Sequence, residues 1–402
     1  GEEDHGVHAF LVPLRDDAGR PLPGITLEDC GFKVGLNGVD NGRIGFDRVR
    51  IPRENLLDRF GQVTAEGVYR SPIPSEGRRF FTMLGTLVTG RISIAAAGIS
   101  AAKSALAVAV RYSDRRRQFG PAGGAQVPVL DYLVHQRLLL PRVAQAYAHH
   151  FAVRALASRY ALAQAGKVHP QDQGASPEEL RARIEVAAAG LKAVTSAASL
   201  EAIQASREAC GGQGYLAANR LGALRQDVDI FTTFEGANPV LLQLVARGLL
   251  SRYREEMGEM NLRSMARYLA DRASQAATRR NPVRSRRTSA DFIQDPSWHL
   301  EALRFREERL LHSAARRLRA LLEEGVDSFE AMNRCQDHLV TLARAHVEAE
   351  ILARFQGPQG QVRRMKVVET LVLDPSRRLV LIRVDDEGLQ RQIGLRRLAH
   401  LR

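Results

Sequence analysis

Residues 176–215 read SPEELRARIEVAAAGLKAVTSAASLEAIQASREACGGQGY and decide the fold. Ser176 is of a residue type favoured at helix N-caps, and Pro177 is favoured at the first helical position. The residues that follow are mostly apolar or small, and the next break is the group of glycines after Cys210. The stretch therefore predicts a long helix from Pro177 to about Ala209, closed by a glycine-rich break at Cys210–Tyr215.

Other segments share this helical texture. Leu84–Tyr112 has apolar residues at helical spacing and small residues that permit close helix packing. Gln126–Ala165 continues as long helices, and a further helix carries Val240–Arg252. These segments predict an antiparallel bundle of about four long helices. Trp298–Gln356 is again helical, after a polar, arginine-rich linker.

The two ends of the chain have a β-like pattern of apolar residues instead. Residues 1 to about 60 are β-like, with an apolar, β-prone run at Val7–Leu14 and imperfect alternation at Ile44–Ile51. Near the other end, Val367–Leu373 and Leu379–Val384 are two β-like runs that predict a hairpin.

We therefore expect a mainly α protein with a partial β domain, a long-helix bundle, a second helical domain and a short β-like C-terminal tail. The predicted boundaries are 1–67, 75–255, 256–358 and 359–402.

Composition is that of an ordinary globular protein. Hydrophobic residues make up 45% of the 402 residues, charged residues 26% and aromatic residues 6%, a balance that favours helices. The formal net charge of +13 favours polyanionic partners, although a solvated basic surface explains it equally well. Much of this charge lies at Arg279–Arg287 and in the tail from Arg363 to Arg402.

Cysteines and termini indicate the cellular setting. Cys30, Cys210 and Cys335 are too few and too widely spaced for a disulfide framework or metal-ligand pairs, so we expect no metal and a reducing compartment. No uninterrupted apolar stretch predicts a transmembrane helix. The acidic start Gly1–His5 is unlike a secretory signal and has no Met, which suggests that the beginning is missing.

The most informative run is DIFTTFEGAN at Asp229–Asn238, where Glu235 stands between Phe234 and Gly236 in an otherwise apolar stretch. Burial disfavours the charged form of a carboxylate and so makes it a better proton acceptor. Gly236 lets a ligand approach the backbone closely. The alternative is an ordinary Glu near a helix N-terminus, favoured there by the helix dipole.

A second run, RRRQFG at Arg115–Gly120, combines three arginines with Gln118 and Phe119. Guanidinium groups match phosphate oxygens, so the run can hold a pyrophosphate. The alternative is a helix C-terminus whose cations complement the helix dipole, with Gly120 as its cap.

The third run is CGGQGY at Cys210–Tyr215. Closely spaced glycines can cradle a phosphate or adenosine group through backbone N–H groups. No strand precedes them, so this is not a Rossmann fingerprint. The alternative is a flexible turn between helices.

Taken together and in order, the motifs resemble acyl-CoA oxidases over about residues 5–355. The resemblance rests on Asn37–Gly42, Phe46–Leu57, Arg111–Gly120, Cys210–Tyr215, Thr233–Gly236 and Gln336–Ala343. It identifies residues 1–67 as the remnant of a middle β domain, 75–255 as the flavin and acyl-CoA domain and 256–358 as the extra helical domain. It implies the acyl-CoA dehydrogenase-like fold.

The activity implied by this resemblance is FAD-dependent α,β-dehydrogenation of acyl-CoA in fatty acid β-oxidation, with electrons passed to O2. Glu235 would be the catalytic base, and Arg91 and Gly236 would lie at the substrate. The cofactor would be held across a homodimer interface, which Arg116, Gln118 and Phe119 would reach across. Gly211, Gly212 and Gly214 would contact its adenosine portion from the other subunit. For Arg91, a solvent-facing helix charge is the equally weighted alternative.

The sequence departs from the family after the base, where Ala237-Asn238-Pro239 stands in place of an acidic residue or Thr followed by Asn-Thr. Pro239 lacks a backbone donor, which puts flavin contacts there in doubt. The family also draws part of its flavin pocket from an N-terminal region that this chain lacks.

Other functions stay open. An acyl-CoA dehydrogenase would deliver electrons to a protein acceptor, and a helical scaffold inactivated by truncation would bind no FAD. A nucleic-acid binder is disfavoured because no basic motif is interleaved with aromatic residues, and we expect no membrane partner. The terminal Leu401-Arg402 is not a peroxisomal Ser-Lys-Leu address. We therefore expect a bacterial, cytoplasmic protein, and a peroxisomal one only in a eukaryote.

Overall fold

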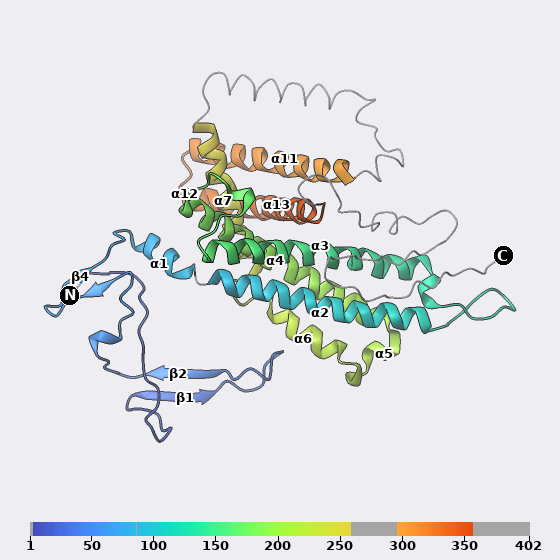
Figure 1. Cartoon of the computed structure of the whole chain (residues 1–402), viewed down its shortest axis with the longest axis horizontal. Helices are drawn as coiled ribbons and strands as arrows, with labels where there is room; N and C mark the ends of the chain where they lie inside the picture. The colour runs from blue at the N-terminus through green and yellow to red at the C-terminus, as the bar shows by residue number, and fades with distance from the viewer. Residues whose placement is uncertain (1–2, 86, 259–295, 357–402) are drawn as a thin grey trace.

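A computed structural model describes residues 3–85, 87–258 and 296–356 of the chain (Figure 1). Helix α4 (Pro177–Ala209) contacts the three other long helices of a bundle, α2 (Leu87–Arg115), α3 (Leu133–Gln164) and α7 (Asn238–Gly258). The prediction of a mainly α protein built on a long-helix bundle is confirmed.

The remaining described helices are shorter or lie after the bundle. They are α1 (Glu76–Leu84), α5 (Gly211–Tyr215), α6 (Leu221–Ile230), α11 (Pro296–Glu323), α12 (Ser328–Arg334) and α13 (Gln336–Gln356), with 3-10 turns at Arg53–Asn55, Val129–Asp131, Pro170–Asp172 and Ala217–Asn219. The arginine-rich run at 279–287 and the predicted tail at 359–402 with its hairpin lie outside the described residues.

Helix α4 begins at the predicted residue. The Ser176 hydroxyl accepts from the Glu179 backbone N–H at 3.2 Å, and the Glu179 carboxylate accepts from the Ser176 N–H at 2.9 Å. This reciprocal capping box satisfies two backbone donors that a helix start leaves unpaired. Because Pro177 occupies the first turn, where its missing N–H is not needed, both sequence signals for this boundary are confirmed.

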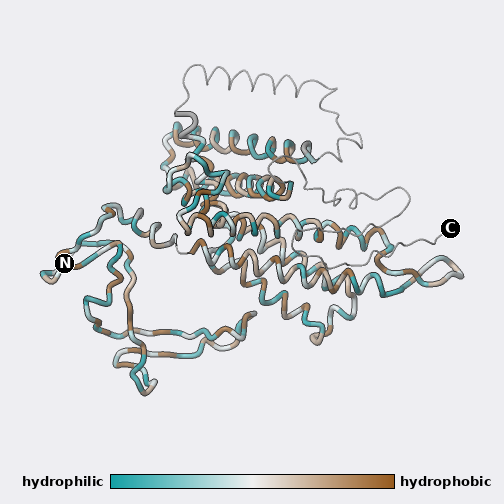
Figure 2. Tube along the Cα trace, viewed as in Figure 1, coloured by the Kyte–Doolittle hydropathy of each residue, from teal (hydrophilic) through white to brown (hydrophobic). Residues whose placement is uncertain are grey.

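The core of the bundle has two parts along α4. In its first half, Ala188 packs in one buried cluster with Val245 of α7 and Leu342 of α13. In its second half, Ile203 packs with Ala102 of α2 in another. Small residues on the contacting faces let the helices approach closely, and apolar residues recur along each helix with polar ones between them (Figure 2).

The N-terminal region forms two short antiparallel pairs. Strand β1 (Ile25–Asp29) pairs with β2 (Gly42–Phe46), and β3 (Gln62–Val63) pairs with β4 (Tyr69–Arg70). The β-prone run at Val7–Leu14 forms no strand, so that expectation is wrong. It pairs with residues 55–57 through one isolated bridge, Phe10 with Leu56, and two backbone hydrogen bonds, and this pairing is too short for a strand.

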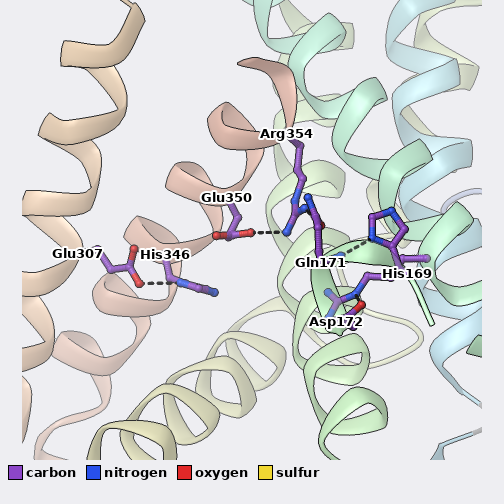
Figure 3. A network of polar contacts seen from close by, with 8 residues as sticks. His169, Gln171, Asp172, Glu307, His346, Glu350 and Arg354 are labelled. Carbon is purple, nitrogen blue, oxygen red and sulfur yellow. Dashed lines mark hydrogen bonds and ion pairs between the residues drawn. The ribbon is translucent and has the colours of Figure 1, made fainter. Parts of the chain in front are cut away.

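The C-terminal helices are tied to the loop between α3 and α4 (Figure 3). Arg159 of α3 pairs with Asp172, whose side chain is 2% exposed, with 2.6 Å between Nε and Oδ2. Beside this pair, Arg354 of α13 donates to Gln171 Oε1 and pairs with Glu350 at 3.0 Å. The loop therefore links the bundle to α13.

Replacing Asp172 with Asn should destabilise the fold by about 3 kcal/mol, because it leaves the Arg159 charge buried without its counter-ion. Urea unfolding measures this change. The matched control is Glu323→Gln, which breaks the exposed pair with Arg319 and should leave the urea midpoint unchanged. A wild-type midpoint for Asp172→Asn would mean that the buried pair does not support the fold.

Two helices, α2 and α4, are long and apolar enough to cross a membrane by length and composition alone. Of their most apolar windows, 44% and 61% are buried within the protein. Core helices of bundles pass the same test, so these lengths are weak evidence for a membrane span.

Candidate active site

Glu235 lies on the turn that joins α6 to α7. Its backbone is left-handed, with φ of 56°, and Gly236 follows with φ of 101°. The Asn238 N–H donates to the Thr232 carbonyl at 3.0 Å and closes the turn. A Glu rarely adopts positive φ, and such residues cluster at functional sites. The conformation therefore marks position 235 as one whose side chain is held in a particular direction.

The first turns of α2 contact Glu235. A Cβ added to Gly90 would lie 2.6 Å from Glu235 Cδ, so only glycine leaves room for the carboxylate against this helix. The next residue, Arg91, donates from Nε to the Glu235 carbonyl at 3.3 Å. Arg91 is only 6% exposed, so the reading as a solvent-facing charge is wrong.

Two buried polar atoms at this turn have no hydrogen-bond partner among the described residues: Glu235 Oε2 and Arg91 Nη1. The nearest carboxylate to this Arg91 nitrogen is Glu185, at 3.9 Å, and burial raises the pKa of Glu185. Unpaired buried polar groups are rare in folded proteins. A bound molecule with a polar group would supply the missing partners.

Lys192 of α4 approaches the same turn from the interior. It is completely buried, and its Nζ donates to the Gly236 carbonyl at 2.8 Å and to Asn238 Oδ1 at 3.0 Å. Asn238 is held in turn by Ser196, with 3.0 Å between Nδ2 and Oγ. Burial, together with the nearby Arg91 charge and against the opposing charge of Glu235, lowers the pKa of Lys192 to about 8.

Lys192 was missed by the sequence reasoning. The signal is a lone lysine within the alanine-rich stretch from Ala187 to Ala198. Lysines are almost never fully buried without partners, but the sequence does not tell a buried helix face from an exposed one at this position.

The arginine-rich run lies at the other end of α2. The helix rises 1.5 Å per residue, so Arg116 is about 37 Å from Arg91. Arg116 and Phe119 are exposed, the latter by 70%, and Gln118 is half-buried. The Gln118 N–H donates to the Val127 carbonyl at 3.0 Å and closes the loop. Within one chain, therefore, this loop does not join Glu235.

Helix α4 ends at Ala209 as expected, and the glycine-rich run after it forms the short helix α5, in which the Gly214 N–H donates to the Cys210 carbonyl at 3.3 Å. Helix α5 follows α4, and the C-terminal end of α4 lies near the C-terminal end of α2 (Figure 1). Gly211 and Gly212 face open space, whereas a Cβ on Gly214 would collide with the Arg207 carbonyl. Close packing against the Arg207 carbonyl is therefore a sufficient reason for a glycine at position 214.

These glycines give a matched pair of variants. Gly214→Ala should lower the melting temperature by several degrees, because backbone atoms must move to admit the methyl group. Gly212→Ala should leave it unchanged, since nothing lies within 4 Å of the added atom. Differential scanning calorimetry of both variants tests this, and equal melting temperatures would contradict the packing argument.

Comparison with protein families gives two matches. The model described as acyl-CoA oxidase, C-alpha1 domain, matches residues 84–250, which contain the bundle and Glu235. The model described as acyl-CoA oxidase matches residues 295–383. The family match thus extends beyond residue 355, where our sequence resemblance ended.

Curated and solved proteins agree with these families. Acyl-coenzyme A oxidase 2, peroxisomal, of Arabidopsis thaliana is 45% identical over 356 residues, which cover 88% of this chain and 50% of that protein. The solved acyl-CoA oxidase 1 of the same plant has a TM-score of 0.75 at 30% identity, covering 92% of this chain and 54% of that one.

A second solved relative carries ligands. The structure of acyl-CoA oxidase-2 from Caenorhabditis elegans, bound with FAD, ascaroside-CoA and ATP, has a TM-score of 0.72 at 28% identity. It covers 90% of this chain and 52% of that one. The chain spans about half the length of the curated relatives that it matches.

The expectation of a bacterial, cytoplasmic protein is wrong. Relatives from Arabidopsis thaliana and Homo sapiens are named as peroxisomal enzymes. The expectation relied on the last residues of the chain, which show only whether one particular targeting signal is present. The comparison rests on similarity over most of the sequence.

Proposed function

This chain belongs to the acyl-CoA oxidase family, and on that premise we propose that it carries the catalytic base for FAD-dependent α,β-dehydrogenation of acyl-CoA thioesters. The product is a trans-2-enoyl-CoA, and the electrons pass to O2 to give H2O2. The observation that carries the proposal is the Glu235 carboxylate, held beside Gly90 on a left-handed turn with one buried oxygen unpaired.

Glu235 removes the proton from C2 of the acyl chain. This proton is too weakly acidic for a carboxylate unless the enolate-like charge on the thioester oxygen is stabilised, and hydrogen-bond donors in a site that excludes water provide that stabilisation. By family resemblance one donor is the backbone N–H of Glu235. Gly236, with no side chain, lets the thioester approach the turn.

Arg91 acts behind the base. Its Nε donates to the Glu235 carbonyl and not to the carboxylate. Its Nη1, which has no hydrogen-bond partner among the described residues, supplies a donor and a positive charge beside the same turn. Bound FAD would supply the hydride acceptor for C3 and the route by which the electrons reach O2.

We assign the FAD contacts to the other end of the bundle. The exposed Arg116 suits a pyrophosphate and the exposed Phe119 suits an aromatic ring, with Gln118 and the open Gly211 and Gly212 beside them. Gly214 contributes through the fold of α5. Because this end is about 37 Å from Arg91, these residues reach a cofactor at Glu235 only from a second chain, so we propose a homodimer.

The domain division is part of the same proposal. Residues 1–67 are taken as part of the middle β domain, 75–255 as the flavin and acyl-CoA domain and 256–358 as the extra helical domain. Pro239 sits in the first turn of α7, where its missing N–H is not needed. The departure from the family at this position is therefore compatible with the turn that carries Glu235.

A spectroscopic titration tests the function. The full-length chain is expressed with excess FAD and mixed anaerobically with acyl-CoA of several chain lengths, and the flavin band near 450 nm is followed. Bleaching, followed by peroxide formation after air is admitted, is expected. Fast dye reduction without peroxide would make the chain a dehydrogenase, and failure to take up FAD would make it a catalytically inactive scaffold.

A further inference from the structure

Lys192 is a buried charge that the reaction as described does not use. Its side chain is completely buried, and its ammonium group donates to Gly236 O and Asn238 Oδ1, the two acceptors that flank Ala237. A buried ammonium is costly unless it is paired and hydrogen-bonded. An apolar residue of the same volume would usually stabilise such a position as well or better, so fold stability does not account for a lysine here.

The turn is held from two sides by two cations. Arg91 of α2 donates to the Glu235 carbonyl, and Lys192 of α4 donates to the next carbonyl along the chain, that of Gly236. The peptide planes on the two sides of Gly236 are therefore fixed in direction, which fixes φ and ψ of Gly236, the residue that follows Glu235 in the turn. Without the Lys192 contact, the Gly236 carbonyl loses the hydrogen bond that ties it to α4.

We propose that Lys192 is a positioning residue for Glu235: it locks the carbonyl of Gly236 and the side chain of Asn238, and thereby holds the left-handed turn that directs the carboxylate past Gly90. This inference rests on the proposed function. The neutral amine of a deprotonated lysine still has two N–H donors for these two acceptors. The positioning contact therefore persists when the charge is lost.

The first experiment needs no cofactor. The chain has only five lysines, Lys33, Lys103, Lys167, Lys192 and Lys366, so 13Cε-lysine labelling of the full-length chain gives few NMR signals. Loss of one signal in Lys192→Met assigns it. That signal should titrate near pH 8, because burial and Arg91 lower the pKa of Lys192, whereas exposed lysines titrate near 10.4.

The effect of Glu235 on the pKa of Lys192 gives a second test. Its charge raises the pKa of Lys192, so Glu235→Gln should move the Lys192 midpoint to lower pH. Arg91 from α2 and Glu235 from the turn are the charged groups that act on Lys192. A signal that titrates with the exposed lysines, or that does not respond to Glu235→Gln, would overturn the proposal.

The second experiment uses the FAD-loaded chain. Lys192→Met should lower kcat for flavin reduction about 10²-fold with little change in KM, since a small misplacement of a reacting group has effects of this size. Asn238→Ala, which removes one of the two acceptors, should give a smaller loss. Lys103→Met, at a half-buried lysine further along α2, is the matched control and should keep the wild-type kcat.

The outcomes separate the two proposals. If wild type bleaches on acyl-CoA and Lys192→Met bleaches equally fast, the positioning role is rejected and the function stands. If wild type does not bleach, the function is rejected, and the Lys192 titration still reports on the contact. Far-UV circular dichroism confirms folding, and Asn238→Ala replaces Lys192→Met should the latter fail to fold.

Discussion

Glu235→Gln should lower the rate of flavin reduction by acyl-CoA about 10⁴-fold, at the upper end of what a positioned base contributes. Gln has the shape of Glu and keeps the backbone contact with Arg91, which uses the carbonyl of residue 235 and not its side chain. It cannot accept a proton from carbon. The variant should therefore bind FAD and acyl-CoA as wild type does and fail only in the chemical step.

Stopped-flow absorbance under anaerobic conditions measures this loss. The matched control is Glu185→Gln, because Glu185 is a second, half-buried carboxylate near Arg91, at 3.9 Å from Nη1. It should retain the rate within a few-fold. If Glu235→Gln keeps the wild-type rate, or Glu185→Gln loses it instead, Glu235 is not the base.

Gly90→Ala should lower the same rate about 10²-fold although it removes no functional group. The added Cβ would lie 2.6 Å from Glu235 Cδ and 2.8 Å from Oε2. The helix does not yield easily, because its neighbours Val88 and Ile92 are buried in the core. The carboxylate must therefore rotate away, and misplacement by about 1 Å has an effect of this size.

The control for this variant lies on the same helix. At Gly98 the nearest atom to an added Cβ is Ser199 Oγ, at 3.3 Å, and it belongs to a small side chain that can shift. Gly98→Ala should keep both FAD absorbance and the reduction rate. A wild-type rate in Gly90→Ala would show that the carboxylate does not occupy the space beside this glycine.

The sequence predicted the parts of the fold that local signals determine. The start of α4 follows from Ser176 and Pro177, which cap a helix wherever they stand. Glu235 and Gly236 were recognised from one short run. The β-prone run at Val7–Leu14 forms no strand because its pairing with residues 55–57 is short, and the length of a pairing depends on a segment distant in sequence.

The candidate site itself depends on contacts between elements remote in sequence. Arg91 and Lys192 reach the turn from α2 and α4, more than 40 residues away from it, and no spacing rule relates them. The family resemblance placed Arg116, Gln118 and Phe119 at the cofactor across a homodimer interface, and this stays a prediction. The length of α2 separates these residues from Glu235 within a chain, which a list of motifs does not reveal.

The left-handed backbone at position 235 has an evolutionary consequence. A non-glycine residue in this conformation is disfavoured by about 1 kcal/mol or more, so folding alone would select Gly or Asn there. On the proposed function, it is the reaction that retains an acid at this position. Once a gene copy is released from selection for activity, drift at position 235 should run toward those two residues, and their presence would identify a descendant that keeps the architecture without the reaction.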